Sequence, residues 1–485
     1  MTRSGIVIAC AFVLAALPLA VVLNIWQDEA FTLHTTAAGI GYAFHEALAF
    51  EQSAPLYFVV LAAMRTLGSA VWYLRSFSIG CIAATILCAA PLARRYVPSI
   101  DPIYPTLVIA VNPLAMWAAL EMRPYALIAL CSALVLLTFY DAFLAENTNI
   151  GRRALFAGVA TIALYTQFYL AFLILGLSAA LLAYRRDRMP ALLACGAVVA
   201  LLFAPMLVVV PGQVANFRAP FPHPTLALSS ASIAFPVVRY VLPAPVPAKL
   251  LIIVVTIALA SLAIFSKASI RSPRWYLPFA TLVAAGLFAV VTNAAGVLVL
   301  ARHVTSLYVP AVLSVFVLIG NLDPFKRLVA ARWWSSVAAA FGILAMLITY
   351  RPLAKPGDWI RVNHFIRDHE RGDEPIAVFE AENALPFAHY YHGPNRIVAI
   401  PSGVDFRRYD LAAFIVHAPV QLSRAFPSAK RVWLLRAGGC QADGVTYGCS
   451  IVDAFIRTRY RPLLSRSFYG ADVYLLEKID ERPTT

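Results

Sequence analysis

The segment GIVIACAFVLAALPLAVVLNIWQDEAF occupies residues 5–31 and joins a long apolar run to two adjacent carboxylates. Residues 5–25 contain no charged side chain, and about 20 apolar residues cross a hydrocarbon layer roughly 30 Å thick. A signal peptide is the alternative, but its apolar core usually has only about 7 to 15 residues. The segment therefore predicts a membrane-spanning helix that ends just before Asp28 and Glu29.

The whole chain shares this apolar character. It has 485 residues, of which 61% are hydrophobic and 13% are charged. Soluble domains average about 45–50% apolar and about 25% charged residues, so most soluble classes are excluded. The formal net charge of +14 would suit nucleic acid only if Lys and Arg clustered on a soluble face, which the bulk of the sequence lacks. We expect a protein that contacts the lipid bilayer and no nucleic acid.

Ten further apolar stretches are bounded by polar clusters, so we expect a polytopic α-helical membrane protein with about 11 transmembrane helices. The fifth stretch is the shortest. The predicted spans are residues 5–25, 70–93, 102–120, 124–145, 154–167, 168–184, 190–210, 249–266, 275–296, 303–321 and 333–350.

Lys and Arg are unequally distributed over the two sides that these spans define. Cytoplasmic loops are enriched in basic residues, so the side with 14 of them is predicted to be cytoplasmic. The N-terminus shares that side, and the chain after Tyr350 is predicted to lie outside the cytoplasm. The 14 are Arg3, Arg94, Arg95, Arg152, Arg153, Arg185, Arg186, Arg188, Lys267, Arg271, Arg274, Lys326, Arg327 and Arg332. The 7 on the other side are Arg65, Arg75, Arg123, Arg218, Arg239, Lys249 and Arg302.

The positive charge of the chain is mainly a signal of this topology. Once the five acidic residues on each side are subtracted, the net charges up to Tyr350 are +9 on the cytoplasmic side and +2 on the outer side. Residues 351–485 add +3. Candidate functional residues are therefore expected among the few outer charges.

Residues 351–485 have a different composition from the rest, with Asp and Glu throughout and short alternating apolar runs. Their length suits one folded domain, and the pattern is typical of a small α/β domain outside the cytoplasm. Residues 1–350 form the expected transmembrane domain, whose outer loop 26–69 carries interfacial helices. In residues 351–485, helices are expected at 358–370, 383–391 and 451–464, and strands at 375–379, 396–400, 432–435 and 471–477.

The seven cysteines fall into two groups. Cys440 and Cys449 lie in the C-terminal domain, where an oxidising compartment would let them form a disulfide. The sequence leaves the bonded and the free forms equally open. The others lie within predicted spans, where packing of a small apolar side chain explains them: Cys10, Cys81, Cys88, Cys131 and Cys195.

None of the ten acidic residues up to Tyr350 lies in the middle of a predicted span. Ionisable groups buried in a bilayer usually mark ion pathways, so this absence argues against a coupled transporter. Any chemistry is therefore expected at the outer surface, although carboxylates there can also simply mark where a helix meets water. The outer acidic residues are Asp28, Glu29, Glu46, Glu51 and Glu121.

The predicted outer face also carries cations, each of which has a structural alternative. Glu121 and Arg123 could pair with each other inside the turn between two spans. Arg302, followed by His303, could anchor a helix by reaching to the membrane interface.

Five segments on this face together resemble landmarks of the GT-C glycosyltransferases. They are WQDEAF at 26–31, PLY at 55–57, WYLR at 72–75, EMRPYAL at 121–127 and Arg302-His303. The resemblance extends over nearly the whole chain and is strongest to the protein O-mannosyltransferase, aminoarabinose transferase and lipopolysaccharide galacturonosyltransferase types. The chain departs from the family at Ser53-Ala54, where relatives often have His-Pro before Pro-Leu-Tyr.

The resemblance implies an inverting transfer of a sugar from a polyprenyl-phosphate donor to a membrane-associated acceptor, which would be lipid A, a glycan or a protein. An acceptor hydroxyl needs a base as it attacks, and Asp28 is the candidate, with Glu29 sharing the acceptor or holding Asp28 in place. The departing phosphate needs fixed cations. The candidates for binding the donor phosphate or sugar are Glu121, Arg123, Tyr125, Arg302, His303 and Arg75.

The sequence has no His-Glu-x-x-His, Cys-x-x-Cys or glycine-rich phosphate loop, so we expect no obligatory cofactor, while a divalent cation could still assist. The expected location is the cell inner membrane. A glycolipid flippase or carrier without catalysis is the main alternative, and a non-catalytic anchoring protein is another. Aromatic and polar residues of the outer domain could line an acceptor groove or simply pack: Trp359, His389, Tyr390, Tyr391 and His392.

Overall fold

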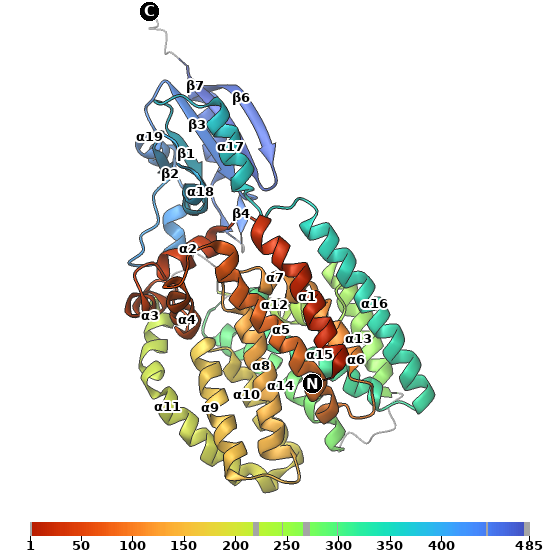
Figure 1. Cartoon of the computed structure of the whole chain (residues 1–485). Helices are drawn as coiled ribbons and strands as arrows, with labels where there is room; N and C mark the ends of the chain where they lie inside the picture. The colour runs from red at the N-terminus through yellow and green to blue at the C-terminus, as the bar shows by residue number, and fades with distance from the viewer. Residues whose placement is uncertain are drawn as a thin grey trace, which may run out of the picture.

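The computed structural model describes residues 2–216, 223–244, 246–264, 272–297, 299–442 and 445–479. Three basic residues used to predict the orientation, Arg218, Lys267 and Arg271, lie outside the described residues, as does the end of the span predicted at 249–266. A body of α-helices is followed by a small sheet domain at one end of it (Figure 1).

Helices α1 to α16 build the helical body. Among the described residues, seven helical stretches are long and apolar enough to cross a membrane, judged by length and composition, and four shorter apolar helices accompany them. The bounds are α1 Arg3–Val22, α2 Gln27–Thr35, α3 Ile40–Ala49, α4 Leu56–Arg65, α5 Val71–Tyr96, α6 Ile103–Ala110, α7 Pro113–Ala119, α8 Tyr125–Phe139, α9 Ile150–Thr166, α10 Leu170–Tyr184, α11 Met189–Asn216, α12 Leu226–Val241, α13 Ala248–Ile264, α14 Tyr276–Ala294, α15 Tyr308–Gly320 and α16 Pro324–Tyr350.

Two features of this body differ from the predicted spans. The span predicted at 102–120 is divided into α6 and α7, because the Asn112 side chain accepts the Leu114 N–H at 3.0 Å and Pro113 takes the first helical position. Helix α12 forms in a stretch to which no span was assigned. Residues 26–69 contain the helices α2, α3 and α4, while the outer side and interfacial position of this loop stay predictions. The number of membrane crossings stays a prediction.

The helices of the body pack closely where small residues meet. A Cβ atom added to Gly176 of α10 would lie 2.3 Å from the Ala280 carbonyl oxygen of α14, and one added to Gly342 of α16 would lie 2.2 Å from the Val111 oxygen. Such small residues let the backbones of membrane helices approach each other. Large apolar side chains face outward instead, among them Leu14, Leu201, Leu282 and Leu347. This outer surface suits contact with lipid.

The C-terminal domain is built on a five-stranded sheet in the order β2-β1-β3-β7-β6. Strands β2, β1 and β3 are parallel, while β7 pairs antiparallel with both β3 and β6. The strands are β1 Ile376–Phe379, β2 Ile397–Ala399, β3 Arg431–Ala437, β6 Tyr460–Phe468 and β7 Ala471–Lys478, with a small hairpin of β4 Gln441–Ala442 and β5 Val445–Thr446. The helices are α17 Trp359–His369, α18 Ala384–Tyr390, α19 Pro419–Ala425 and α20 Cys449–Arg459.

Both faces of this sheet are covered. Ile376 and Val378 pack with α17 on one face, while Ala377 and Phe379 belong to the core that includes residues of α19 and α20. This alternation follows from the two-residue period of a strand. Among the described residues, the predicted strands and the helices at 358–370 and 383–391 are confirmed.

The helix predicted at 451–464 is wrong beyond Arg459, because residues 460–468 form strand β6. Pro462 lacks the N–H that a helix interior needs, and pairing with β7 places the segment at the edge of the sheet. Cys440 and Cys449 are joined by a disulfide at the start of α20.

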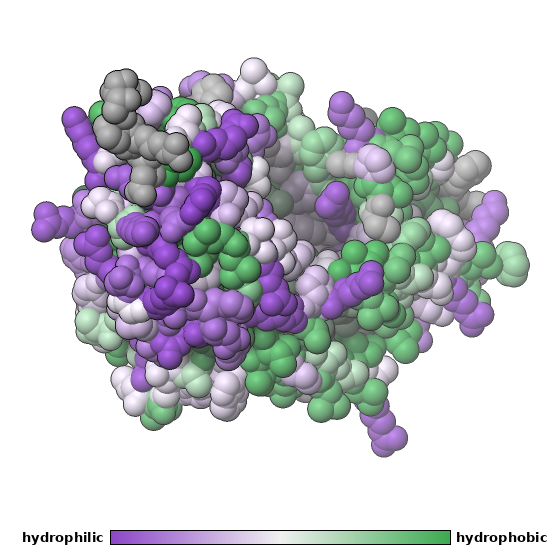
Figure 2. Space-filling view, turned by 90° about the horizontal axis from the view of Figure 1, so that it is seen from above, coloured by the Kyte–Doolittle hydropathy of each residue, from purple (hydrophilic) through white to green (hydrophobic). Residues whose placement is uncertain are grey.

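The C-terminal domain lies over the end of the helical body where α1 ends and α2 begins, and the N-terminus lies at the far end of α1 (Figure 1). The Ile25 N–H donates to the Tyr390 hydroxyl of α18 at 2.8 Å. Seen from the side of this domain, hydrophilic residues gather on one part of the surface, hydrophobic residues cover the rest, and the face is hollowed between them (Figure 2). The acidic segment of residues 26–31 therefore lies where the two parts of the chain meet.

Candidate active site

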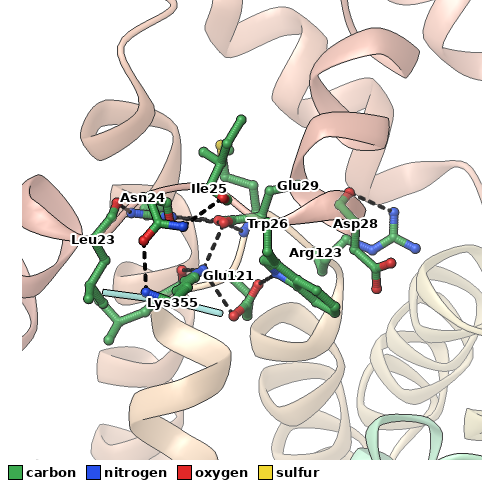
Figure 3. A network of polar contacts seen from close by, with 12 residues as sticks. Leu23, Asn24, Ile25, Trp26, Asp28, Glu29, Glu121, Arg123 and Lys355 are labelled. Atoms are coloured by element: carbon green, nitrogen blue, oxygen red, sulfur yellow. Dashed lines mark hydrogen bonds and ion pairs between the residues drawn. The ribbon is translucent and has the colours of Figure 1, made fainter. Parts of the chain in front are cut away.

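The acidic pair lies in the first turn of α2, directly after the extended residues 23–26 that follow α1. Carboxylates are favourable there because the N-terminus of a helix carries partial positive charge. Asp28 and Glu29 are 7% and 0% exposed. Their side chains point to opposite sides of the chain (Figure 3), so the two carboxylates have separate surroundings.

Glu29 is bound on every side. Arg75 donates from Nε to Oε1 at 2.9 Å and from Nη2 to Oε2 at 2.8 Å, and Lys355 Nζ donates to Oε2 at 2.7 Å. The Met122 N–H also donates to Oε1, at 3.1 Å. Although burial alone would raise the pKa of Glu29, Arg75 and Lys355 lower that pKa to about 2. Glu29 is therefore a structural anion that holds the start of α2.

Arg75 is fully buried, and its donors are taken by the protein itself. Besides Glu29, it donates to the carbonyl oxygens of Ala20 at 3.1 Å, Leu23 at 2.7 Å and Asn24 at 3.0 Å. These five bonds use all five N–H groups of a guanidinium. Arg75 was a sequence candidate for binding the donor phosphate, but this geometry gives it a supporting role beneath the acidic pair.

Glu121 joins the same network from the turn before α8. Its Oε1 lies 3.0 Å from Lys355 Nζ, and Trp26 Nε1 donates to its Oε2. The pair of Glu121 with Arg123 that the sequence allowed is not formed, and Glu121 does not orient Arg123. Figure 3 shows Glu121 on the side of Lys355, away from Arg123.

Arg123 lies beside Asp28 and is paired with another acidic residue. Its Nη1 donates to Glu51 Oε2 at 2.7 Å and to Thr32 Oγ1 at 3.2 Å, and it lies 3.4 Å from the Asp28 carbonyl oxygen. The Thr35 hydroxyl donates to the second oxygen of Glu51 at 3.2 Å. Glu51 thus fixes a cation next to Asp28, a role that its position in the outer loop did not reveal.

The Asp28 carboxylate itself differs from its neighbours. Within the described part of the chain, no donor forms a hydrogen bond to it, and the Thr32 hydroxyl and Arg123 contact only its backbone carbonyl oxygen. A carboxylate without such a donor retains its capacity to accept a proton. Among the two acidic residues of α2, Asp28 is thus the one available for chemistry.

Arg302 and His303 lie in the 3₁₀ helix Ala301–Leu307 that leads into α15. The Leu300 N–H donates to His303 Nδ1 at 3.3 Å, and the ring of His303 lies 5.5 Å from that of Tyr169. Tyr125, which stacks on Trp117 at 4.7 Å, lies within electrostatic range of Arg302, Arg123 and Asp28. The two cations and the available carboxylate are thus gathered around the start of α8.

Solved structures show the same arrangement of the chain. ArnT from Cupriavidus metallidurans bound to undecaprenyl phosphate matches with a TM-score of 0.60 and 12% identity, covering 98% of both chains. The apo state of ArnT matches with a TM-score of 0.59 and 12% identity, covering 96% of this chain and 97% of the other. The chain has the fold of ArnT. No protein-family model and no curated protein sequence matches it.

The ArnT-like fold explains why sequence reasoning missed two members of the site. Lys355 follows α16 and contacts Glu29 and Glu121, which are hundreds of residues earlier in the chain. Glu51 meets Arg123 across the outer loop. No local spacing signals either contact. The rule that a buried carboxylate needs a cationic partner says only that such a partner exists, and not which residue it is.

Glu121 allows a prediction about how the stability of the protein depends on pH. Burial raises the pKa of Glu121 to about 7, with repulsion from Glu29 adding to it and Lys355 opposing it, against an ordinary value of 4.5. A carboxyl group with a raised pKa binds its proton more tightly in the folded state, so its contribution to stability falls as pH rises through this window. Glutamine imitates the protonated form. We expect the difference in Tm, wild type minus Glu121→Gln, to decrease as the pH rises from about 5 to about 8.

The measurement is thermal unfolding in a mild detergent across this pH range. Glu477→Gln is the matched control. Arg461 lowers the pKa of Glu477, so Glu477 titrates at a lower pH than Glu121. An unchanged Tm difference for Glu121→Gln would show that Glu121 does not titrate in this range.

Proposed function

We propose that the chain is an inverting glycosyltransferase that moves a sugar from a polyprenyl-phosphate donor to a cell-envelope acceptor. The observation that carries this proposal is the Asp28 carboxylate, which no donor of the described residues binds, beside the cation Arg123. The ArnT fold adds support, since ArnT has been solved with undecaprenyl phosphate bound.

In this mechanism Asp28 accepts the proton of an acceptor hydroxyl while the oxygen attacks the anomeric carbon of the donor sugar. The bond between that carbon and the phosphate oxygen breaks, and its electron pair goes to the phosphate. Arg302 and Arg123 stabilise the negative charge that develops there, with His303 and Tyr125 beside them. A single displacement inverts the anomeric configuration.

The proposed location rests on the same arrangement. We propose that residues 1–350 form the transmembrane catalytic domain in a cell inner membrane and residues 351–485 a domain outside the cytoplasm. The N-terminus and the C-terminal domain lie at opposite ends of α1 (Figure 1), which supports their lying on opposite sides of the membrane. The acceptor, which is lipid A, a glycan or a protein, would then reach Asp28 from the outer side.

The test is transfer by purified protein from a series of defined polyprenyl-phosphate sugars to a cell-envelope extract. We expect wild type to release polyprenyl phosphate together with a glycosylated product of inverted configuration. Failure with every donor of the series would contradict the proposed function.

Arg302→Ala tests the phosphate contact. Hydrogen bonds to charged groups contribute about 1.5–3 kcal/mol, which corresponds to a loss of about 10-fold to 100-fold in kcat/KM for the donor. Arg239→Ala is the matched control, because Arg239 is an exposed cation at the end of α12. Equal kcat/KM values for the two variants would remove Arg302 from the site.

A further inference from the structure

Lys355 connects the C-terminal part of the chain to the network under the acidic pair. It lies in the segment between α16 and α17 and is 7% exposed. Its Nζ contacts Glu29 Oε2 at 2.7 Å, Glu121 Oε1 at 3.0 Å and the Leu120 carbonyl oxygen at 2.8 Å. Its backbone N–H donates to Asn24 Oδ1 at 2.8 Å. Figure 3 shows Lys355 enclosed by these groups.

With Glu121 ionised, the network is balanced in charge only when Lys355 is present. It contains the two carboxylates of Glu29 and Glu121 and the two cations Arg75 and Lys355, and no side chain of the four is more than 8% exposed. Removal of one partner from a buried ion pair leaves a charge without compensation, which is strongly unfavourable. Lys355 is the cation that contacts both carboxylates.

The segment that carries Lys355 is itself fixed to the C-terminal sheet. The Gly357 N–H donates to the Tyr469 carbonyl oxygen, between β6 and β7, at 2.9 Å. Gly357 has φ +103°, a conformation that favours glycine, and a Cβ atom there would lie 2.4 Å from the Trp359 ring. The segment around Lys355 therefore connects the C-terminal domain to residues 24–29.

The contacts of Lys355 fix the position of the backbone at Asp28. The backbone N–H of Lys355 holds Asn24 just before α2, and its side chain holds Glu29 within the first turn, so residue 355 fixes the chain on both sides of Asp28. Of these two contacts, Lys355→Met removes only the one with Glu29. Asp28 lies on the opposite side of this turn from Lys355 (Figure 3), so Lys355 does not contact the reacting atoms.

We propose that Lys355 is a positioning residue, which locks the first turn of α2 to the C-terminal domain and thereby directs the Asp28 carboxylate toward the acceptor. The effect on catalysis rests on the proposed function, whereas the ordering of the first turn of α2 by Lys355 can be measured without activity.

The experiment compares Lys355→Met, Glu121→Gln and the double variant in the full-length protein. Amide hydrogen exchange reports on residues 24–32, and transfer kinetics report on Asp28. For Lys355→Met we expect faster exchange in residues 24–32 with unchanged exchange in β1, and about a 10²-fold loss of kcat, the size typical of a displaced catalytic group, with donor KM nearly unchanged. Lys430→Met, at an exposed lysine of the same domain, should match wild type in both measurements.

The double variant separates charge balance from general damage. Its remaining pair, Glu29 with Arg75, is balanced, so we expect it to fold even if Lys355→Met does not. Its exchange in residues 24–32 should still exceed that of Glu121→Gln. Wild-type exchange in Lys355→Met, or exchange in the double variant equal to that of Glu121→Gln, would overturn the proposal. Inactivity of wild type on every donor would contradict the proposed function alone. Amide hydrogen exchange in residues 24–32 would still test whether Lys355 holds the first turn of α2.

Discussion

Asp28→Asn is expected to reduce the rate of sugar transfer about 10²-fold to 10⁴-fold, the range that a positioned general base contributes. Asparagine keeps the size and shape of the side chain but cannot accept the acceptor proton. The loss should appear in kcat, because the donor phosphate is bound by other groups. Since the Asp28 carboxylate accepts no hydrogen bond from the described residues, the substitution should also leave Tm nearly unchanged.

Two further variants serve as controls for Asp28→Asn. Asp373→Asn removes an exposed carboxylate from the C-terminal domain and should keep wild-type kcat. Glu29→Gln removes the neighbouring carboxylate that Arg75 and Lys355 bind, so it should lower Tm as well as activity. Full activity of Asp28→Asn would remove Asp28 as the base, and loss of fold would show that its role is structural.

Arg75→Met should destabilise the protein by about 3–5 kcal/mol, the cost of breaking a buried ion pair. Glu29 would lose two hydrogen bonds, and the carbonyl oxygens of Ala20, Leu23 and Asn24 would lose their donor at the end of α1. Arg75→Lys should recover little of this loss, since an ammonium group cannot reproduce the planar fork. Thermal and denaturant unfolding in detergent measure both variants.

The control for this variant is an arginine pair at the surface. Arg461 pairs with Glu477, but its side chain is 69% exposed, so Arg461→Met should change stability by less than about 1 kcal/mol. An Arg75→Met protein as stable as Arg461→Met would mean that the network under α2 does not hold the end of α1 in place.

The sequence reveals those parts of the fold that depend on local pattern. Apolar runs predict the long helices because lipid accepts only a backbone whose polar groups are bonded within the segment. The parallel strands β1 and β2 are visible as short apolar runs between polar turns. Residues 460–464 were predicted to be helical, but they are extended because they pair with β7, and Pro462 was the local signal against a helix.

The candidate site was also only partly predictable from the sequence. The adjacent pair Asp28 and Glu29 is conspicuous in sequence, but which of the two is available depends on Arg75 and Lys355, whose positions follow from packing over the whole chain. The sequence allowed a pair of Arg123 with the nearest acid, Glu121, whereas the fold brings Glu51 to Arg123. Proximity along a chain is therefore a weak guide to ion pairs in a buried turn.

The position of Lys355 in the chain has a consequence for biosynthesis. Glu29 is synthesised early and Arg75 soon afterwards, but the cation that both Glu29 and Glu121 share is added only after the last helix of the body has been made. During synthesis the earlier domain begins to fold first. A nascent chain that has not reached residue 355 therefore lacks the cation that Glu29 and Glu121 share, so this network is complete only after the helical body has been made.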